Sequence, residues 1–180
     1  CQFGYRESFF KRAGKDQYVI VSVTFRLDKK HILNTSYGTI SQELEQMGIL
    51  EPTINDVSNA VIAIRSSKLP DPKVLGNAGS FFKNPVVAKE LAEKIKKDFP
   101  DAAVYPAGDG LVKLAAGWLI EKAGLKGYDA GTHGVHDKQA LVLVNKGSAT
   151  GKEIFDLSTK VLQSVKEKFG VDLEREVNIL

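Results

Sequence analysis

The stretch from Gly76 to Pro85 constrains the fold of this chain more than any other part of the sequence. Its glycines, at positions 76 and 79, can adopt backbone angles closed to residues with a Cβ atom, so their N–H groups can point toward a ligand. Ser80 follows directly and adds a hydroxyl donor, and the two phenylalanines after it can keep water away. Such a turn suits a small anionic substrate, although glycine-rich turns are often only structural.

Two prolines just before this stretch predict a domain boundary. Pro70 and Pro72 force an extended path, because each fixes its own backbone and disfavours a helical residue before it. We therefore predict one domain at 1–67 and a second at 68–180.

Hydrophobic spacing predicts that helices and strands intermix along the chain. The expected helices cover 41–47, 54–67, 86–99, 115–123 and 151–169, and residues 1–12 form a short helical or turn segment. The expected strands cover 18–27, 102–105, 111–113, 128–133, 140–145 and 172–180. This order predicts an α+β fold with a mixed or antiparallel sheet.

The charge balance argues against a nucleic-acid partner. The 180 residues carry 25 Lys and Arg against 22 Asp and Glu, and the excess is spread along the chain. A nucleic-acid groove usually needs clustered cations, whereas a small anion is compatible with this balance. The sequence has no apolar run of membrane-spanning length. Its one cysteine, Cys1, excludes an intrachain disulfide, so we expect a cytoplasmic protein.

Two other motifs suggest chemistry and are better explained as structure. The run from Gly147 to Lys152 resembles a phosphate loop, but it is one residue short, and Glu153 replaces the hydroxyl residue that would hold Mg²⁺. We expect a turn and a helix start there. His133 and His136 lie near Asp137, but a metal site needs three or four convergent ligands. We therefore expect loop histidines and no metal.

The segment from Leu173 to Val177 places two carboxylates, Glu174 and Glu176, on one face of an extended chain and Arg175 on the other. Considered alone, it is a solvated strand face. Tyr5 and Arg6 likewise look like an ordinary helix start.

Several of these motifs occur together in an order that resembles the UDP-N-acetylenolpyruvoylglucosamine reductase family. They are the segments 3–8, 65–73, 76–85 and 173–177, and the resemblance runs from Cys1 to about Asn178. It implies the C-terminal substrate domain and the tail of a flavin-binding domain, so we expect the chain to be part of a longer protein. Ser36 to Gly38 resembles the loop of the subtype in which a tyrosine folds over bound substrate.

The resemblance implies a role in making UDP-N-acetylmuramate, a peptidoglycan precursor, with FAD as cofactor and NADPH as co-substrate. The flavin would pass a hydride to the enolpyruvyl group of the substrate, and Ser80 would donate the proton. Arg6 would neutralise the developing carboxylate charge, and Glu176 would orient or donate to the intermediate. As a further hypothesis, the N–H groups of Gly79 and Phe81 stabilise the serine alkoxide.

The remaining site residues also come from the resemblance. Those expected to contact the UDP-sugar are Tyr37, Lys68, Asn84, Tyr105, Lys113 and Gln139, and those expected at the flavin are Tyr5 and Gly79. The expected partner is UDP-N-acetylglucosamine enolpyruvate, with no nucleic acid, no membrane and a monomeric protein. Two alternatives stay open: a non-catalytic UDP-sugar binding module and a plain interaction domain.

Overall fold

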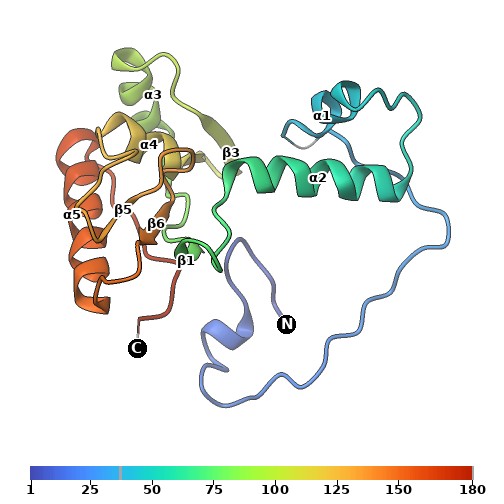
Figure 1. Cartoon of the computed structure of the whole chain (residues 1–180), viewed down its shortest axis with the longest axis horizontal. Helices are drawn as coiled ribbons and strands as arrows, with labels where there is room; N and C mark the ends of the chain where they lie inside the picture. The colour runs from blue at the N-terminus through green and yellow to red at the C-terminus, as the bar shows by residue number, and fades with distance from the viewer. Residues whose placement is uncertain (37, 180) are drawn as a thin grey trace. The chain divides into compact units, whose positions relative to one another are not determined.

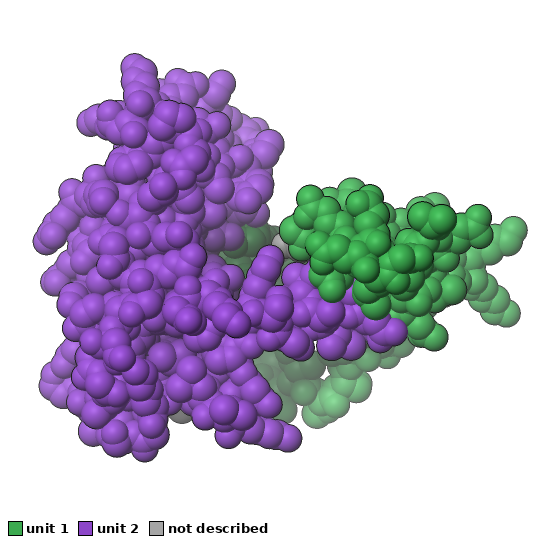
Figure 2. Space-filling view, turned by 45° about the horizontal axis from the view of Figure 1, so that its top comes forward, with its two compact units in different colours: residues 1–57 green, residues 58–180 purple. Residues whose placement is uncertain are grey.

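The computed structural model describes residues 1–36 and 38–179. The chain divides into two compact units, residues 1–57 and 58–180, coloured separately in Figure 2. Each is described by itself. The domain boundary at 67/68 stays a prediction.

The first unit contains little regular structure. A 3-10 helix covers Phe9–Lys11, and α1 covers Ile40–Gln46, close to the expected 41–47. The rings of Phe9 and Phe10 both contact Tyr18, with centroids 5.7 and 6.1 Å apart. This aromatic cluster confirms a compact turn near the start of the chain.

The strand expected at 18–27 is wrong for the described structure, where this segment has no regular secondary structure. A strand needs hydrogen-bonding partners, and no described strand pairs with this segment. Both alternating faces are exposed as a result: Val21 is 91% exposed and Ile20 is 60% exposed.

Helix α2 covers Ile54–Lys68, one residue longer than the expected helix. Its start is fixed by Thr53, whose N–H and hydroxyl both donate to the Asp56 carboxylate, at 2.8 and 2.6 Å. The hydroxyl bond and then the N–H bond lower the pKa of Asp56 below its ordinary value. The hydrophobic spacing and the acidic residue in the first turn therefore both indicate a helix start at this point.

One three-stranded antiparallel sheet contains β1 (Gly76–Ser80), β6 (Val142–Asn145) and β5 (His133–Val135), in the order β1-β6-β5 (Figure 1). The first half of the stretch expected to be a turn is thus a strand, with an irregular register between Asn77 and Ser80. Tyr128 is not in a strand, and β5 begins only at the end of the expected range.

A second antiparallel sheet has the order β2-β4-β3 and contains β2 (Val86–Ala88), β4 (Leu111–Leu114) and β3 (Val104–Gly108). Helix α3 (Lys89–Asp98) follows β2 directly and packs on this sheet. The helix expected from 86 therefore begins later, because Val86–Ala88 pairs with β4. Helix α4 covers Ala116–Lys122.

Helix α5 (Gly151–Phe169) has the expected bounds. Thr150 and Glu153 form a capping box, and Gly170, at φ 67°, ends the helix in the left-handed conformation. The turn and helix start expected at Gly147 to Lys152 are therefore confirmed. Leu157, Val161 and Val165 form the buried stripe of α5, which packs on α4, β5 and β6 (Figure 1).

The strand expected at 172–180 is wrong over the described residues. Only Arg175 pairs there, in a single antiparallel bridge with Phe82, and Leu180 lies outside the described residues. The α+β class is confirmed, with both sheets antiparallel. No described helix is long and apolar enough to span a membrane.

Candidate functional site

Ser80 lies at the end of β1, partly buried, with Val142 of β6 as its cross-strand partner. Gly79 before it has φ +71°, a conformation that side-chain-bearing residues rarely adopt. No atom lies within 4 Å of the position that a Cβ on Gly79 would take. The backbone beside Ser80 is therefore open to close approach by a ligand.

Asn77 holds the turn that leads to Ser80. Its side-chain N–H₂ donates to the carbonyl oxygens of Pro70 and Leu75, at 3.2 and 2.8 Å. Its side-chain oxygen accepts the Gly79 N–H at 3.0 Å. The sequence analysis missed this role, although an Asn two residues before a Gly is a common sign of such a turn.

The hypothesis that two backbone N–H groups stabilise the serine alkoxide is wrong for this structure. The Gly79 N–H donates to Asn77, and the Phe81 N–H donates to the carbonyl oxygen of Leu141 at 2.8 Å. Each N–H carries one proton, so both donors are already used.

Two backbone hydrogen bonds join the C-terminal segment to the residues that follow Ser80. The N–H of Glu176 donates to the carbonyl oxygen of Phe81 at 2.8 Å, and the N–H of Lys83 donates to that of Glu174 at 2.9 Å. The side chains of Lys83 and Glu174 also form an ion pair. Glu176 therefore lies opposite the residue that follows Ser80.

Tyr105 and Lys113 are cross-strand partners in the β3–β4 pair. Directly opposed residues project from the same face of an antiparallel sheet, so the phenol and the ammonium share one face. Tyr105 is 51% exposed and also lines a hollow of about 450 Å³ with Lys89, Lys96 and Asp109. This face can receive an anionic ligand.

Asn84 has a structural contact that the sequence analysis missed. Its side-chain oxygen accepts the backbone N–H of Ala116, the first residue of α4, at 2.9 Å. Ala116 is fully buried, so this N–H has no access to water. An amide side chain also has an N–H₂ group, which could bind a ligand while the oxygen holds the helix.

Gln139 is held in a chain of hydrogen bonds that leads to Phe81. The Nδ1 atom of His136 accepts the Gln139 N–H at 3.2 Å, and the Gln139 side-chain oxygen accepts the Leu141 N–H at 3.4 Å. The carbonyl oxygen of Leu141 in turn accepts the Phe81 N–H. His136 is thus a loop histidine, as expected, and it orders a predicted substrate residue. The same expectation is wrong for His133, which is the first residue of β5.

The other predicted residues are not brought to this site by any contact described above. Lys68 is the exposed last residue of α2. In the first unit, Arg6 has φ 56° and its guanidinium lies 5.9 Å from the Tyr5 ring centroid. Tyr37 lies outside the described residues. Within the described residues, no three His, Cys, Asp or Glu side chains converge to hold a metal ion.

The fold and these contacts define a small α+β domain with a polar site where β1 meets the C-terminal segment. A profile of the UDP-N-acetylenolpyruvoylglucosamine reductase C-terminal domain matches residues 71–180. The chain belongs to the UDP-N-acetylenolpyruvoylglucosamine reductase family.

Proteins named UDP-N-acetylenolpyruvoylglucosamine reductase align with nearly the whole chain. The one from Flavobacterium johnsoniae is 57% identical over 100% of this chain and 54% of its own length. That from Chromobacterium violaceum is 58% identical over 100% of this chain and 53% of its own. That from Pseudomonas aeruginosa is 51% identical over 99% of this chain and 52% of its own length. The chain thus spans about half the length of these relatives.

Proposed function

We propose that this chain is the substrate-binding and proton-donating part of an enzyme that reduces UDP-N-acetylglucosamine enolpyruvate to UDP-N-acetylmuramate. The observation that carries the proposal is the hydrogen bond from the Glu176 N–H to the Phe81 carbonyl. It brings the backbone of Glu176 opposite Phe81, the residue after Ser80, and so supports a shared role for the two side chains. Family membership supplies the substrate and the direction of the reaction.

When bound, FAD reduced by NADPH would supply the hydride for the terminal carbon of the enolpyruvyl ether. Two residues of this chain fit the cofactor: Gly79 leaves its Cβ position open beside Ser80, and Tyr5 offers a 47% exposed aromatic ring. An open glycine backbone lets a flat ring approach closely, and an aromatic ring can stack on it.

Ser80 donates the proton that completes the reduction. After hydride addition, negative charge develops on the adjacent carbon and its carboxylate, and this carbon takes the proton from the serine hydroxyl. A hydroxyl is a weak acid in water, so the site has to be dry. The next two residues, Phe81 and Phe82, are buried at 5% and 1% exposure and exclude water on their side.

Arg6 and Glu176 act on the same developing charge. The guanidinium of Arg6 offers two parallel N–H donors that match a carboxylate. Glu176 can assist an anion only when it is protonated or paired, so we assign it the orientation or protonation of the intermediate.

The proposed substrate contacts divide by chemistry. Lys68 and Lys113 are cations suited to the diphosphate, and Tyr37 is assigned a diphosphate contact as well. Tyr105, Asn84 and Gln139 provide the aromatic ring and amide groups that would hold the rest of the UDP-sugar. NADPH and UDP-sugars are cytoplasmic metabolites, so we place the enzyme in the cytoplasm, acting as a monomer.

The test is Ser80→Ala in the protein at the full length of its relatives. Flavin reduction by NADPH should be unchanged, whereas flavin reoxidation by substrate should slow by on the order of 100- to 10,000-fold. Both steps are followed by stopped-flow absorbance in the flavin bands. Unchanged reoxidation would remove Ser80 from the role of proton donor.

The placement of the proposed sugar contacts favours a second candidate, a UDP-sugar binding module. Five of the six proposed contacts lie in the second unit. Calorimetric titration of the chain with UDP-N-acetylglucosamine and with FAD separates the two. Binding of the nucleotide sugar alone supports the module, and binding of both supports the catalytic unit.

A further inference from the structure

Arg175 occupies a position where the alternation of the C-terminal segment calls for an apolar residue. Val171 and Leu173 are buried, Val177 packs against the core, and Asp172 and Glu174 between them are exposed. Arg175 falls on the core side of this alternation and is partly buried. A cation at such a position needs specific partners to offset the loss of water.

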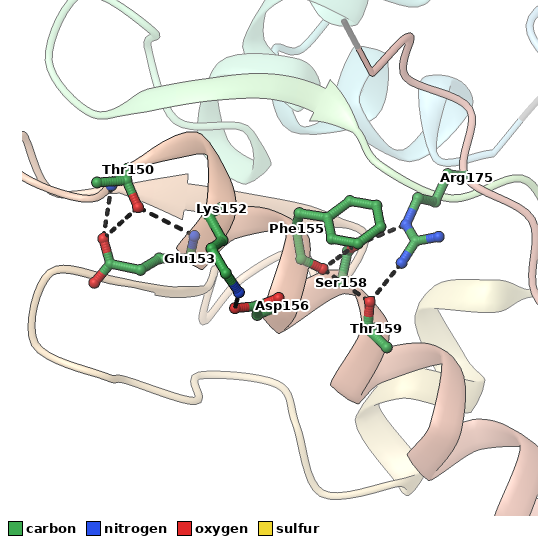
Figure 3. A network of polar contacts seen from close by, with 8 residues as sticks. All are labelled: Thr150, Lys152, Glu153, Phe155, Asp156, Ser158, Thr159 and Arg175. Atoms are coloured by element: carbon green, nitrogen blue, oxygen red, sulfur yellow. Dashed lines mark hydrogen bonds and ion pairs between the residues drawn. The ribbon is translucent and has the colours of Figure 1, made fainter.

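Helix α5 provides these partners (Figure 3). The Arg175 Nε–H donates to the Ser158 hydroxyl at 2.7 Å, and a terminal N–H donates to the Thr159 hydroxyl at 2.8 Å. The guanidinium also lies 4.4 Å from the centroid of the Phe155 ring, within the range of a cation–π contact.

The two hydroxyl groups are held in one orientation. Both Ser158 and Thr159 donate to the carbonyl oxygen of Phe155, at 2.6 and 3.1 Å. Their protons are therefore used, and only their lone pairs face the guanidinium. Ser158 is fully buried, so water cannot replace Arg175 at its oxygen. The network is specific for a donor at position 175.

We propose that Arg175 is a positioning residue for Glu176. In an extended segment, neighbouring side chains project to opposite faces, so fixing Arg175 on α5 directs the Glu176 carboxylate to the other face. Arg175 also forms the only bridge of this segment with Phe82 among the described residues. The guanidinium thus helps to fix the face to which the Glu176 carboxylate projects, at a position opposite Phe81, the residue after Ser80. The inference rests on the proposed function, because it gives Glu176 a role in the reaction.

The first test is Arg175→Met in the full-length protein, which keeps the apolar stem and removes the donors. Amide exchange at Glu176 and Lys83, the two backbone donors of the bridge, should become faster, with exchange in β6 unchanged. Reoxidation of the flavin by substrate should slow by about 10- to 100-fold, since small displacements of a catalytic group have effects of this size. The KM for substrate and flavin reduction by NADPH should stay as in the wild type.

Thr159→Val provides a second, volume-conserving variant that removes one acceptor. It should also make amide exchange at Glu176 faster. Adding Arg175→Met to the Thr159→Val variant should then accelerate this exchange less than Arg175→Met does in the wild-type protein. Lys152→Met is the matched control, because Lys152 pairs with Asp156 on the exposed side of the same helix, at 2.6 Å (Figure 3). It should change neither the amide exchange at Glu176 nor the rate of flavin reoxidation by substrate.

The outcomes are distinguishable. Unchanged exchange at Glu176 in both variants overturns the proposal. Faster exchange throughout the second unit, with flavin reduction also lost, shows a general structural role and overturns it as well. If the wild-type protein does not oxidise reduced flavin with this substrate, the proposed function fails, and the exchange data still decide whether Arg175 fixes Glu176.

Discussion

The backbone N–H of Glu176 donates to the carbonyl oxygen of Phe81 at 2.8 Å, which joins the end of the chain to the strand that carries Ser80. The bond belongs to a single bridge between Phe82 and Arg175, not to a long ladder. Among the described residues, this bridge is the strand-like pairing that holds the proposed carboxylate residue near the proposed acid. Variants of those contacts should affect the site before they affect the fold.

Asn84→Asp should separate helix support from substrate binding. Aspartate keeps an oxygen that can accept the Ala116 N–H, so the stability of the chain should be preserved. It lacks the N–H₂ donors and adds a negative charge near an anionic substrate, so KM should rise by about 10- to 100-fold. Steady-state kinetics and urea unfolding measure the two effects.

Asn84→Ala is the counterpart of that variant. It leaves the buried Ala116 N–H without its acceptor, which should lower the free energy of unfolding by about 1–3 kcal/mol. If Asn84→Asp were as unstable as Asn84→Ala, the aspartate would not support the helix, and the two roles of Asn84 could not be separated in this way. An unchanged KM in Asn84→Asp would remove the amide from the substrate site.

Asn77→Ala should loosen the turn before Ser80. It removes two donated bonds and one accepted bond from a partly buried side chain, at a cost of about 1–3 kcal/mol in unfolding free energy. Amide exchange at Gly79 should also accelerate, because its acceptor is lost. Asn59→Ala, on the exposed surface of α2, is the control and should be nearly neutral. Protected exchange at Gly79 in Asn77→Ala would contradict this account.

Elements with complete local signals were predicted well from the sequence. Helix α5 was predicted to the residue from its apolar stripe and from Gly170 at its end, and the structure adds the capping box of Thr150 and Glu153 at its start. Strands depend on distant partners and were predicted less well. The alternating segment from 18 has no described partner strand, whereas β1, rich in Gly and Asn, is a strand because β6 supplies its hydrogen bonds.

In the candidate site, too, features with a local sequence signal were predicted and features that depend on distant residues were not. The alternation from Leu173 to Val177 correctly predicted Arg175 on the face opposite Glu174. The bridge that brings this segment to Phe82 could not be predicted from local pattern, because it joins distant parts of the chain. The proposed Phe81 N–H donor was wrong for the same reason, because Leu141, which accepts it, is remote in sequence. The proposed Gly79 donor was wrong because of a local contact with Asn77 that the sequence analysis missed. The catalytic roles of Ser80, Glu176 and Arg6 stay predictions.

Glu153→Gln should reduce the acid sensitivity of the start of α5. The backbone N–H of Thr150 and then its hydroxyl hold the pKa of Glu153 below its ordinary value. A lowered pKa stabilises the fold above the unfolded pKa of about 4.3, and this contribution is lost as the pH falls through the folded value. Glutamine does not titrate, so its variant should lose less stability between pH 6 and pH 3.

Urea unfolding at these pH values measures the effect. The control is Glu167→Gln, because Glu167 is an exposed carboxylate near the other end of α5. This variant should lose as much stability at acid pH as the wild type does, since it keeps Glu153. Equal acid sensitivity in Glu153→Gln and the wild type would exclude the capping box as a source of it.

Alanine substitutions at three glycines should change the stability of the chain in a fixed order, from a large loss at Gly134 to a small gain at Gly151. At Gly134, an added Cβ would lie 2.2 Å from the Tyr128 carbonyl oxygen, a backbone atom that also accepts the Val135 N–H, so the loss should be about 3 kcal/mol or more. At Gly79 the space is open, and only the positive φ opposes a side chain, at about 1–2 kcal/mol. Gly151 has open space at the start of α5 and should gain up to about 1 kcal/mol. Urea unfolding of the chain gives the order, and a Gly79 variant less stable than the Gly134 variant would mean that the turn before Ser80 is more tightly packed than its geometry indicates.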